Sequence, residues 1–281
     1  MNTILHLSQK LPLTCTRKGT CCLGNQVVLN PWELHRLAFE KQISTREFRD
    51  SYCDWNGILL KFNGEKDQRG KSACSQYISN FGCSLHEGRP LACRLFPIGR
   101  QIQNETVQYI FQGDAFPCLN GCPEVNELPQ LTVEAYLSGQ QTSLFEQAQD
   151  EYLEVMQNIA DIALRLLLDT GLTTSGDTQT RIEWRKMGTE TPAQIAERIG
   201  EKWLDLFTLP HIAFSAENSK AFILAHQELL QENAQNQIDT LTNFAEIRTL
   251  AIQMMALALF LGKSIGADVK ALAEMWSEVG E

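Results

Sequence analysis

The sequence predicts an α-rich protein of the α+β class, in which a small, irregular cysteine-rich region precedes a helical bundle. All nine cysteines lie between Cys15 and Cys122, and none occurs in the last 159 residues. Residues 1–125 carry 14 Lys and Arg against 11 Asp and Glu, whereas residues 126–281 carry 10 against 23. Apolar residues recur at helical spacing from about Leu131 onward. We therefore expect a metal-binding region over residues 1–125 and a helical region over residues 126–281.

The first region reads as short elements joined by loops. Asn30 followed by Pro31 is a helix start, with Asn as the N-cap and Pro at the first helical position, and this helix is expected to end near Gln42. Ser44 followed by Glu47 matches a capping box and predicts a second helix through about Asp54. Residues 58–62 and 106–111 are rich in β-branched, aromatic and leucine side chains and predict strands.

The second region predicts five helices. The clearest covers residues 144–168, where apolar residues recur at helical spacing over seven turns. Thr191, Pro192 and Gln194 supply an N-cap, a first-position proline and a capping-box partner for a helix that should reach about Leu206. Further helices are expected over residues 216–231, 238–261 and 267–279, and residues 171–180 read as a polar linker. Mostly short loops between these segments indicate a bundle.

Composition excludes several classes of partner and compartment. The formal net charge of −10 argues against general nucleic-acid binding, because phosphate contacts need clustered Lys and Arg. Residues 1–12 do not form a secretory signal, and the longest apolar stretch, residues 254–262, is about half of a membrane span, so we expect no membrane partner and a cytoplasmic location. Thiols stay reduced in the cytoplasm, which favours metal ligands over disulfides.

The candidate metal ligands lie in four short segments. Thiolates are soft ligands suited to zinc and to iron–sulfur clusters, and most of these thiols have Gly or Pro nearby, where a chain turns tightly. Because adjacent cysteines usually point in different directions, Cys21 and Cys22 need not share one metal. Cys53 falls on the second predicted helix and is interpreted as a core residue. The candidates are Cys15, Cys21, Cys22, Cys74, Cys83, Cys93, Cys118 and Cys122.

Two of these segments resemble the signatures of a known family. The stretch from Cys15 to Cys22, with Gly19 and the Cys21-Cys22 pair, resembles the CxxCGxCC or CxxCxxCC signature of the YkgJ-type zinc- or iron-chelating family. Residues 82–97, with a Cys, Arg-Pro, Cys-Arg and a Pro, resemble its second signature. The resemblance covers about residues 12–125 and departs at Lys18, where the family has a cysteine, so Cys118 or Cys122 is a candidate replacement. It implies that Cys15, Cys21, Cys22, Cys74, Cys83 and Cys93 are ligands.

The number of thiols bears on the kind of metal. Six to eight thiolates exceed the four that one zinc ion takes, which favours an iron–sulfur cluster over zinc. The first expectation is a [4Fe–4S] cluster. Two metal ions would also account for this number of thiolates. We expect Cys22, Cys83 and Cys93 to contact one centre. His86 is a further candidate ligand, although a lone loop histidine is more often solvated or hydrogen-bonded.

Two arginines lie beside these thiols and admit two interpretations. Arg89 and Arg94 either bind the cofactor region, by offsetting thiolate charge or holding an anionic substrate, or form ion pairs with the acidic helices. The sequence lacks the GxGxxG, HExxH and GxSxG motifs, which lowers the expectation of dinucleotide, zincin and hydrolase chemistry.

Three functions follow from this reading, and whether the protein is an enzyme stays open. The first is a metal-cluster protein in redox chemistry or in the modification of a macromolecule, with a protein as substrate or partner. The second, from the resemblance, is a protein lysine N-methylase related to the flagellin lysine methylases. The third is a non-enzymatic metal-chelating scaffold.

Overall fold

The chain forms two compact units, each assembled from separate stretches of sequence. The computed structural model describes residues 2–16, 19–103, 106–112, 122–169 and 177–279. Unit 1 comprises Met1–Val27, Glu40–Gln42 and Leu60–Glu146, and unit 2 comprises Val28–Phe39, Ile43–Leu59 and Gln147–Glu281. Within the described residues there are eleven α-helices and only short strands, which confirms the predicted α-rich class.

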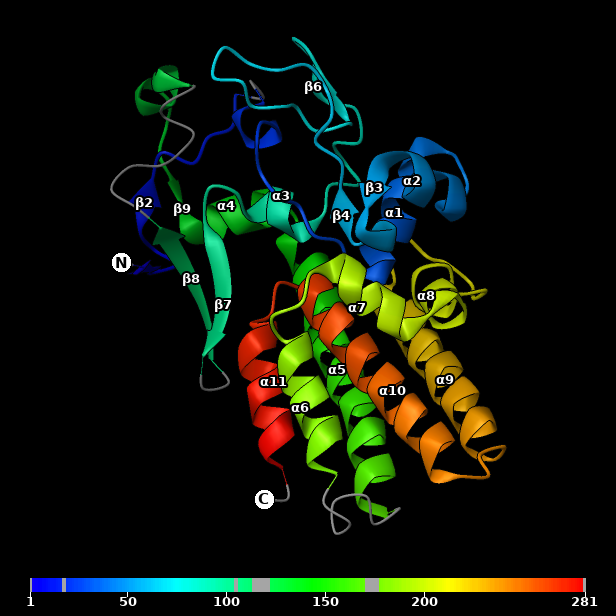
Figure 1. Cartoon of the computed structure of the whole chain (residues 1–281). Coiled ribbons are helices and arrows are strands. Elements are labelled where there is room, and N and C mark those ends of the chain that lie inside the picture. Colours follow the sequence, from blue (N-terminus) through cyan, green and yellow to red (C-terminus); the bar gives the residue numbers. More distant parts are fainter. Residues whose placement is uncertain (1, 17–18, 104–105, 113–121, 170–176, 280–281) are drawn as a thin grey trace. The chain divides into compact units, whose positions relative to one another are not determined.

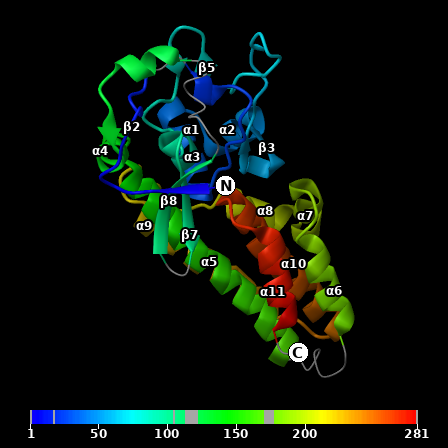
Figure 2. The same cartoon turned by 90° about the vertical axis from the view of Figure 1, so that its left-hand side faces the viewer.

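The longest strands belong to an antiparallel sheet in unit 1. Strand β8 (Thr106–Gln112) is central, with β1 (Asn2–Leu5) on one side and β7 (Gly99–Gln103) on the other. β8 coincides with the strand predicted over residues 106–111, whereas β1 and β7 were not anticipated. Figure 2 shows β7 and β8 as a hairpin. This sheet supplies unit 1 with its only strands longer than two residues among those described.

The rest of unit 1 consists of very short elements. Two-residue strands pair as β2 (Lys10–Leu11) with β9 (Leu131–Thr132) and as β5 (Tyr77–Ile78) with β6 (Gly82–Cys83). The helical elements are η1 (Thr20–Cys22), α3 (Leu91–Leu95), η4 (Pro123–Glu127) and α4 (Val133–Gly139). Elements this short cannot bury much apolar surface individually, so turn geometry has a large share in positioning the side chains of unit 1.

Unit 2 includes most of the first two predicted helices. Helix α1 (Pro31–Lys41) begins as expected, because Asn30 and Glu33 each accept a hydrogen bond from the other's backbone N–H. Helix α2 (Thr45–Tyr52) is capped by the Ser44 hydroxyl. It ends two residues before the predicted Asp54, because the chain becomes extended at β3 (Cys53–Asp54), which pairs with β4 (Leu59–Leu60) after η2 (Trp55–Gly57). The strand predicted over residues 58–62 is therefore only two residues long.

The helical bundle of unit 2 is built around α10. Helix α10 contacts α6, α7 and α11 within the bundle drawn in Figures 1 and 2, and residues 254–262 of α10 are almost completely buried. The bundle helices are α5 (Thr142–Asp169), α6 (Thr178–Met187), α7 (Pro192–Ile199), α8 (Glu201–Thr208), α9 (Ser219–Ile238), α10 (Phe244–Ser264) and α11 (Val269–Glu278). This continuous apolar core explains why helical periodicity predicted most of these helices from sequence.

Two bundle predictions need correction. The single helix expected from Thr191 to about Leu206 is broken at Gly200, whose φ of 82° lies outside the helical range and separates α7 from α8. Helix α6 begins at Thr178, inside the stretch read as a linker, because Asp177 caps it by accepting from the Thr180 N–H. Residues 170–176 lie outside the described residues.

Helix α10 is the one described helix that is long and apolar enough to cross a membrane by length and composition alone. Core helices of proteins that enter no membrane meet the same criterion. Of its most apolar window, 56% is buried inside the structure.

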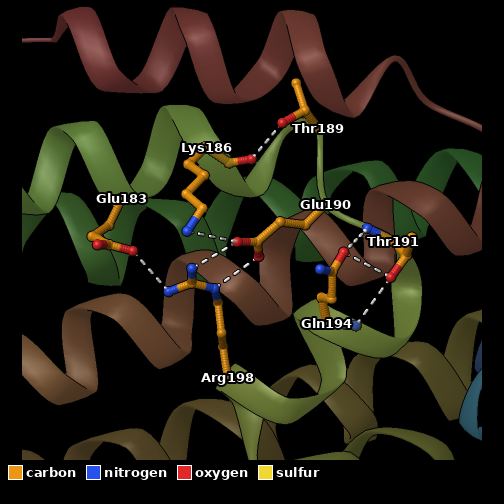
Figure 3. Close-up of polar contacts among 7 residues, drawn as sticks. All are labelled: Glu183, Lys186, Thr189, Glu190, Thr191, Gln194 and Arg198. Carbon is orange, nitrogen blue, oxygen red and sulfur yellow. Dashed lines mark hydrogen bonds and ion pairs between the residues drawn. The ribbon is translucent and has the colours of Figure 1, made fainter.

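A charged network joins α6 to α7. Arg198 donates to both carboxylate oxygens of Glu190, at 2.7 Å each, and to Glu183 at 2.9 Å (Figure 3). Beside it, Thr191 and Gln194 form the predicted capping box. Because the Glu190 side chain is only 8% exposed, its pairing with Arg198 offsets the cost of burying its charge.

Candidate metal centre

A single turn of 3₁₀ helix presents the first two thiols. Gly19 precedes η1 with a φ of 80°, a left-handed conformation that glycine adopts without strain, and its carbonyl accepts from the Cys22 N–H at 2.7 Å. This turn places the sulfurs of Cys21 and Cys22 3.9 Å apart. The two thiols therefore lie on the same side of the chain, although they are neighbours in sequence.

Backbone pairing brings Cys74 to the same place. The Cys74 N–H donates to the Cys22 carbonyl at 2.7 Å, and Leu23 forms an antiparallel bridge with Ala73. Gly24 continues the pairing by donating to the Ser72 carbonyl at 3.0 Å. Cys22 and Cys74, separated by 51 residues of chain, are thus linked directly through their peptide groups.

Two further segments, the β5–β6 hairpin and helix α3, carry Cys83 and Cys93. The Tyr77 N–H donates to the Cys74 carbonyl at 2.9 Å, and Tyr77 lies opposite Cys83 in the β5–β6 hairpin. Cys93 lies in the first turn of α3, with its N–H bonded to the Pro90 carbonyl at 3.0 Å. The Arg-Pro of the second signature therefore opens the short helix that carries Cys93.

Five thiols of unit 1 are close enough to alter one another's protonation. A hydrogen bond from Cys22 lowers the pKa of Cys21 to about 7, against the opposing effect of burial. The pKa of Cys22 is raised, first because its proton is held by Cys21, then by burial and by charge on Cys21, Cys93 and Cys83. Of the two thiols, Cys21 therefore loses its proton first.

Burial governs the other three thiols. It raises the pKa of Cys74 to about 11, that of Cys83 above its usual value, and that of Cys93 well above it. Charge on Cys21 raises all three further. Five partly buried thiols that repel one another's negative charge form a group that a cation would stabilise.

Arg89 supplies positive charge to this group. It lowers the pKa of Cys21, Cys83 and Cys93. Its guanidinium is fixed by hydrogen bonds to the His86 carbonyl at 2.9 Å and to the Gln140 side chain at 3.0 Å. These contacts support the interpretation in which Arg89 offsets thiolate charge.

Arg94 has a structural role. It is 3% exposed and donates to the carbonyls of Arg89, at 2.8 Å, and of Gln140, at 2.7 Å, and also to the Glu87 carbonyl. Its guanidinium also lies over the Phe145 ring, 4.0 Å from the centroid. Arg94 therefore holds the backbone on both sides of Arg89, which the sequence could not show because Gln140 lies in another segment.

The remaining candidate cysteines lie differently. Cys122 is buried, and its sulfur is 3.3 Å from the hydroxyl of Thr20, the residue before Cys21. Cys15 is exposed. Cys53 is buried in unit 2, as expected for a core residue. Cys118 lies outside the described residues.

The five thiols suit a zinc or iron ion by their chemistry, and part of the geometry is already in place. Soft thiolates are the ligands that both metals take in Cys-rich sites. In the portion of the chain that the structure describes, no three His, Cys, Asp or Glu side chains converge closely enough to hold an ion. The Cys21–Cys22 pair is thus assembled, and the other thiols would have to approach it for a metal to bind.

One known family matches part of the chain. Residues 14–110 match the family model described as "CxxCxxCC: Putative zinc- or iron-chelating domain". This part of the chain resembles a CxxCxxCC domain. The matched range contains Cys21, Cys22, Cys74, Cys83 and Cys93 and ends before Cys122. No curated protein and no solved structure matches the chain.

Proposed function

We propose that the chain is a metal-binding protein in which the CxxCxxCC domain holds an iron–sulfur centre in preference to zinc. The observation that supports this most directly is that contacts link thiols from separate segments. The Cys21 and Cys22 sulfurs lie 3.9 Å apart, the Cys74 N–H donates to the Cys22 carbonyl, and Cys83 lies opposite Tyr77, whose N–H donates to the Cys74 carbonyl. The thiols Cys21, Cys22, Cys74, Cys83 and Cys93 supply the ligands. The set exceeds the four thiolates of one zinc site by one, and an iron–sulfur centre with one spare reactive thiol fits it.

Such a centre supports redox chemistry or the modification of a macromolecule, with a protein as substrate or partner. Arg89 fits this role because a cluster of thiolates is anionic and gains from a fixed positive charge nearby. The proposal places the protein in the cytoplasm, where thiols stay reduced.

Anaerobic purification of the full chain tests the proposal. We expect a brown protein with visible absorbance, stoichiometric iron and acid-labile sulfide. A colourless protein with one zinc per chain would instead support the chelating scaffold. A chain without bound metal after anaerobic reconstitution with iron and sulfide, or with zinc, would contradict metal binding altogether.

Substitution of one ligand sharpens that test. Cys93→Ser should weaken metal binding by more than the roughly 10–100-fold that loss of a supporting hydrogen bond costs a metal site. Cys53→Ser is the matched control, since Cys53 is also a cysteine but is buried in unit 2. Equal metal content in wild type and Cys93→Ser would remove Cys93 from the ligand set.

A further inference from the structure

The spacing of the two adjacent thiols matches a particular kind of metal coordination. Cys21 and Cys22 hold their sulfurs 3.9 Å apart. Two thiolates on one tetrahedral ion, each about 2.3 Å from it, lie roughly 3.8 Å from each other. The turn of η1 therefore already has the sulfur spacing of one half of a tetrahedral site.

The number of thiolates on each ion separates the classes of Cys-ligated centre. A single tetrahedral zinc or iron ion takes four thiolates, and a [2Fe–2S] cluster divides four cysteines between two irons, two on each. A [4Fe–4S] cluster divides four cysteines among four irons, one on each. Thiolates on different irons of such a cube point away from one another, which does not suit a pair of sulfurs already in contact.

We propose that Cys21 and Cys22 bind the same metal ion, as a two-thiolate half-site. This inference rests on the proposed metal-binding function and specifies its chemistry. The centre is an ion with two adjacent thiolates, as in a mononuclear site or a [2Fe–2S] cluster, rather than a [4Fe–4S] cube. Two of Cys74, Cys83 and Cys93 supply the remaining thiolates.

Gly19 and Tyr77 position the half-site. A Cβ at residue 19 would lie 2.2 Å from Cε2 of Tyr77, so the turn passes directly against the tyrosine ring. Tyr77 is itself tied to Cys74 through its backbone N–H and faces Cys83 across the hairpin. A side chain at residue 19 would therefore displace either the turn that pairs the sulfurs or the ring that connects it to Cys74 and Cys83.

The composition of the centre is the first test. The full chain, purified anaerobically, should contain two irons and two acid-labile sulfides, or one zinc or iron without sulfide. Four irons and four sulfides would overturn the shared-ion proposal and leave metal binding intact. A chain that binds no metal would overturn both.

Cobalt(II) titration of the metal-free protein is the second test, because the thiolate-to-cobalt absorption band grows with the number of thiolates. Cys21→Ser and Cys22→Ser should each lower the band by roughly a quarter, from four thiolates to three. An undiminished band in either variant would show that the pair does not share the ion.

Alanine substitutions at two glycines test whether Gly19 positions the half-site. Gly19→Ala keeps every thiol, and we expect it to weaken cobalt(II) binding by about tenfold or more, the lower end of the cost of losing support around a metal site. Gly70→Ala is the control, because Gly70 has a similar φ of 76° but no atom within 4 Å of its Cβ position. Equal affinities of the two variants would show that the contact of Gly19 with Tyr77 does not position the half-site.

Discussion

The two units of this chain are stabilised in different ways. In unit 2, α10 buries nine consecutive residues, 254–262, among the other bundle helices. In unit 1, most described strands have two residues, and turns and peptide hydrogen bonds tie the cysteine segments together. Unit 2 can thus rely on apolar burial alone, whereas the cysteine segments of unit 1 need a further source of stability.

The largest expected effect is the loss of metal. Because binding free energy becomes folding free energy in a site assembled from loops, an excess of metal 1,000-fold above its dissociation constant contributes about 4 kcal/mol. We expect a chelator to increase hydrogen exchange and proteolysis within the unit 1 residues 19–27 and 60–95 and to leave the helical circular dichroism nearly unchanged. Hydrogen exchange read by mass spectrometry measures both units in one experiment.

Equal protection of residues 19–27 and 60–95 with and without chelator would contradict this difference between the units. Loss of the helical signal together with the metal would also contradict it, because unit 2 would then depend on the centre.

The second-largest expected effect is a loss of stability on truncating a side chain in the core of unit 2. Phe260 is fully buried in α10 and its ring makes an edge contact with Phe207 at 5.8 Å. Phe260→Ala should lower the free energy of unfolding by about 3–5 kcal/mol, since it removes a large buried side chain and leaves a cavity. Urea unfolding followed by circular dichroism measures the change, and cobalt(II) bound per folded chain should not change.

Phe244→Ala is the matched control on the same helix. Phe244 is 63% exposed at the start of α10, so its truncation should change the free energy of unfolding by no more than about 0.5 kcal/mol. Similar costs for the two variants would show that α10 does not form the core as described.

Acid should also destabilise unit 2. The His226 Nε2 lies 3.2 Å from the Leu206 carbonyl, which can only accept, so Nε2 carries the proton and Nδ1 accepts from the Tyr152 hydroxyl at 3.0 Å. Burial lowers the pKa of His226 from 6.5 to about 3, and that of His35 from 6.5 to about 4.

The direction of the pH effect follows from these shifts. The unfolded chain takes up protons below pH 6.5 while the folded histidines stay neutral, so stability is present above pH 6.5 and is lost as the pH falls toward 4. Each histidine costs about 1.4 kcal/mol for each pH unit in that window. Urea unfolding at pH 7.5 and pH 5 measures the loss, and His226→Gln should make it smaller.

His211→Gln provides the comparison, because His211 is exposed. A pH dependence that is the same in wild type and His226→Gln would contradict the role given to His226.

How much the sequence predicted differs between the units for physical reasons. Helix starts in unit 2 were predictable because caps depend on residues close in sequence. Thr191 and Gln194, three residues apart, form a capping box. The break at Gly200 was missed because apolar periodicity continues across it, from Ile199 to Trp203, both buried. A helix break that leaves the spacing of apolar residues unchanged cannot be predicted from that spacing.

For the candidate site, the sequence predicts cysteine ligands but not the arrangement of these cysteines. The spacing of Cys21 and Cys22 depends on a 3₁₀ turn at Gly19, and adjacent cysteines in most conformations point apart. The contacts of Arg94 with Gln140 and Phe145 arise from distant segments that no local motif encodes. The division into regions at residue 125 stays a prediction.

The smallest expected effect concerns a single cap in unit 2. The Thr191 hydroxyl accepts from the Gln194 N–H at 3.3 Å, and the Gln194 side chain accepts from the Thr191 N–H at 2.9 Å (Figure 3). Thr191→Ala removes one half of this box and should cost about 1 kcal/mol, equivalent to a decrease in Tm of roughly 2–4 °C. Thr191→Ser keeps the hydroxyl and should retain most of the stability. Because the cap lies in unit 2, the lower Tm should appear in scanning calorimetry for the same transition in which the helical circular dichroism is lost. The metal content should not change. If the Tm decreased only for the transition in which metal is released, the cysteine segments and the bundle would instead unfold together.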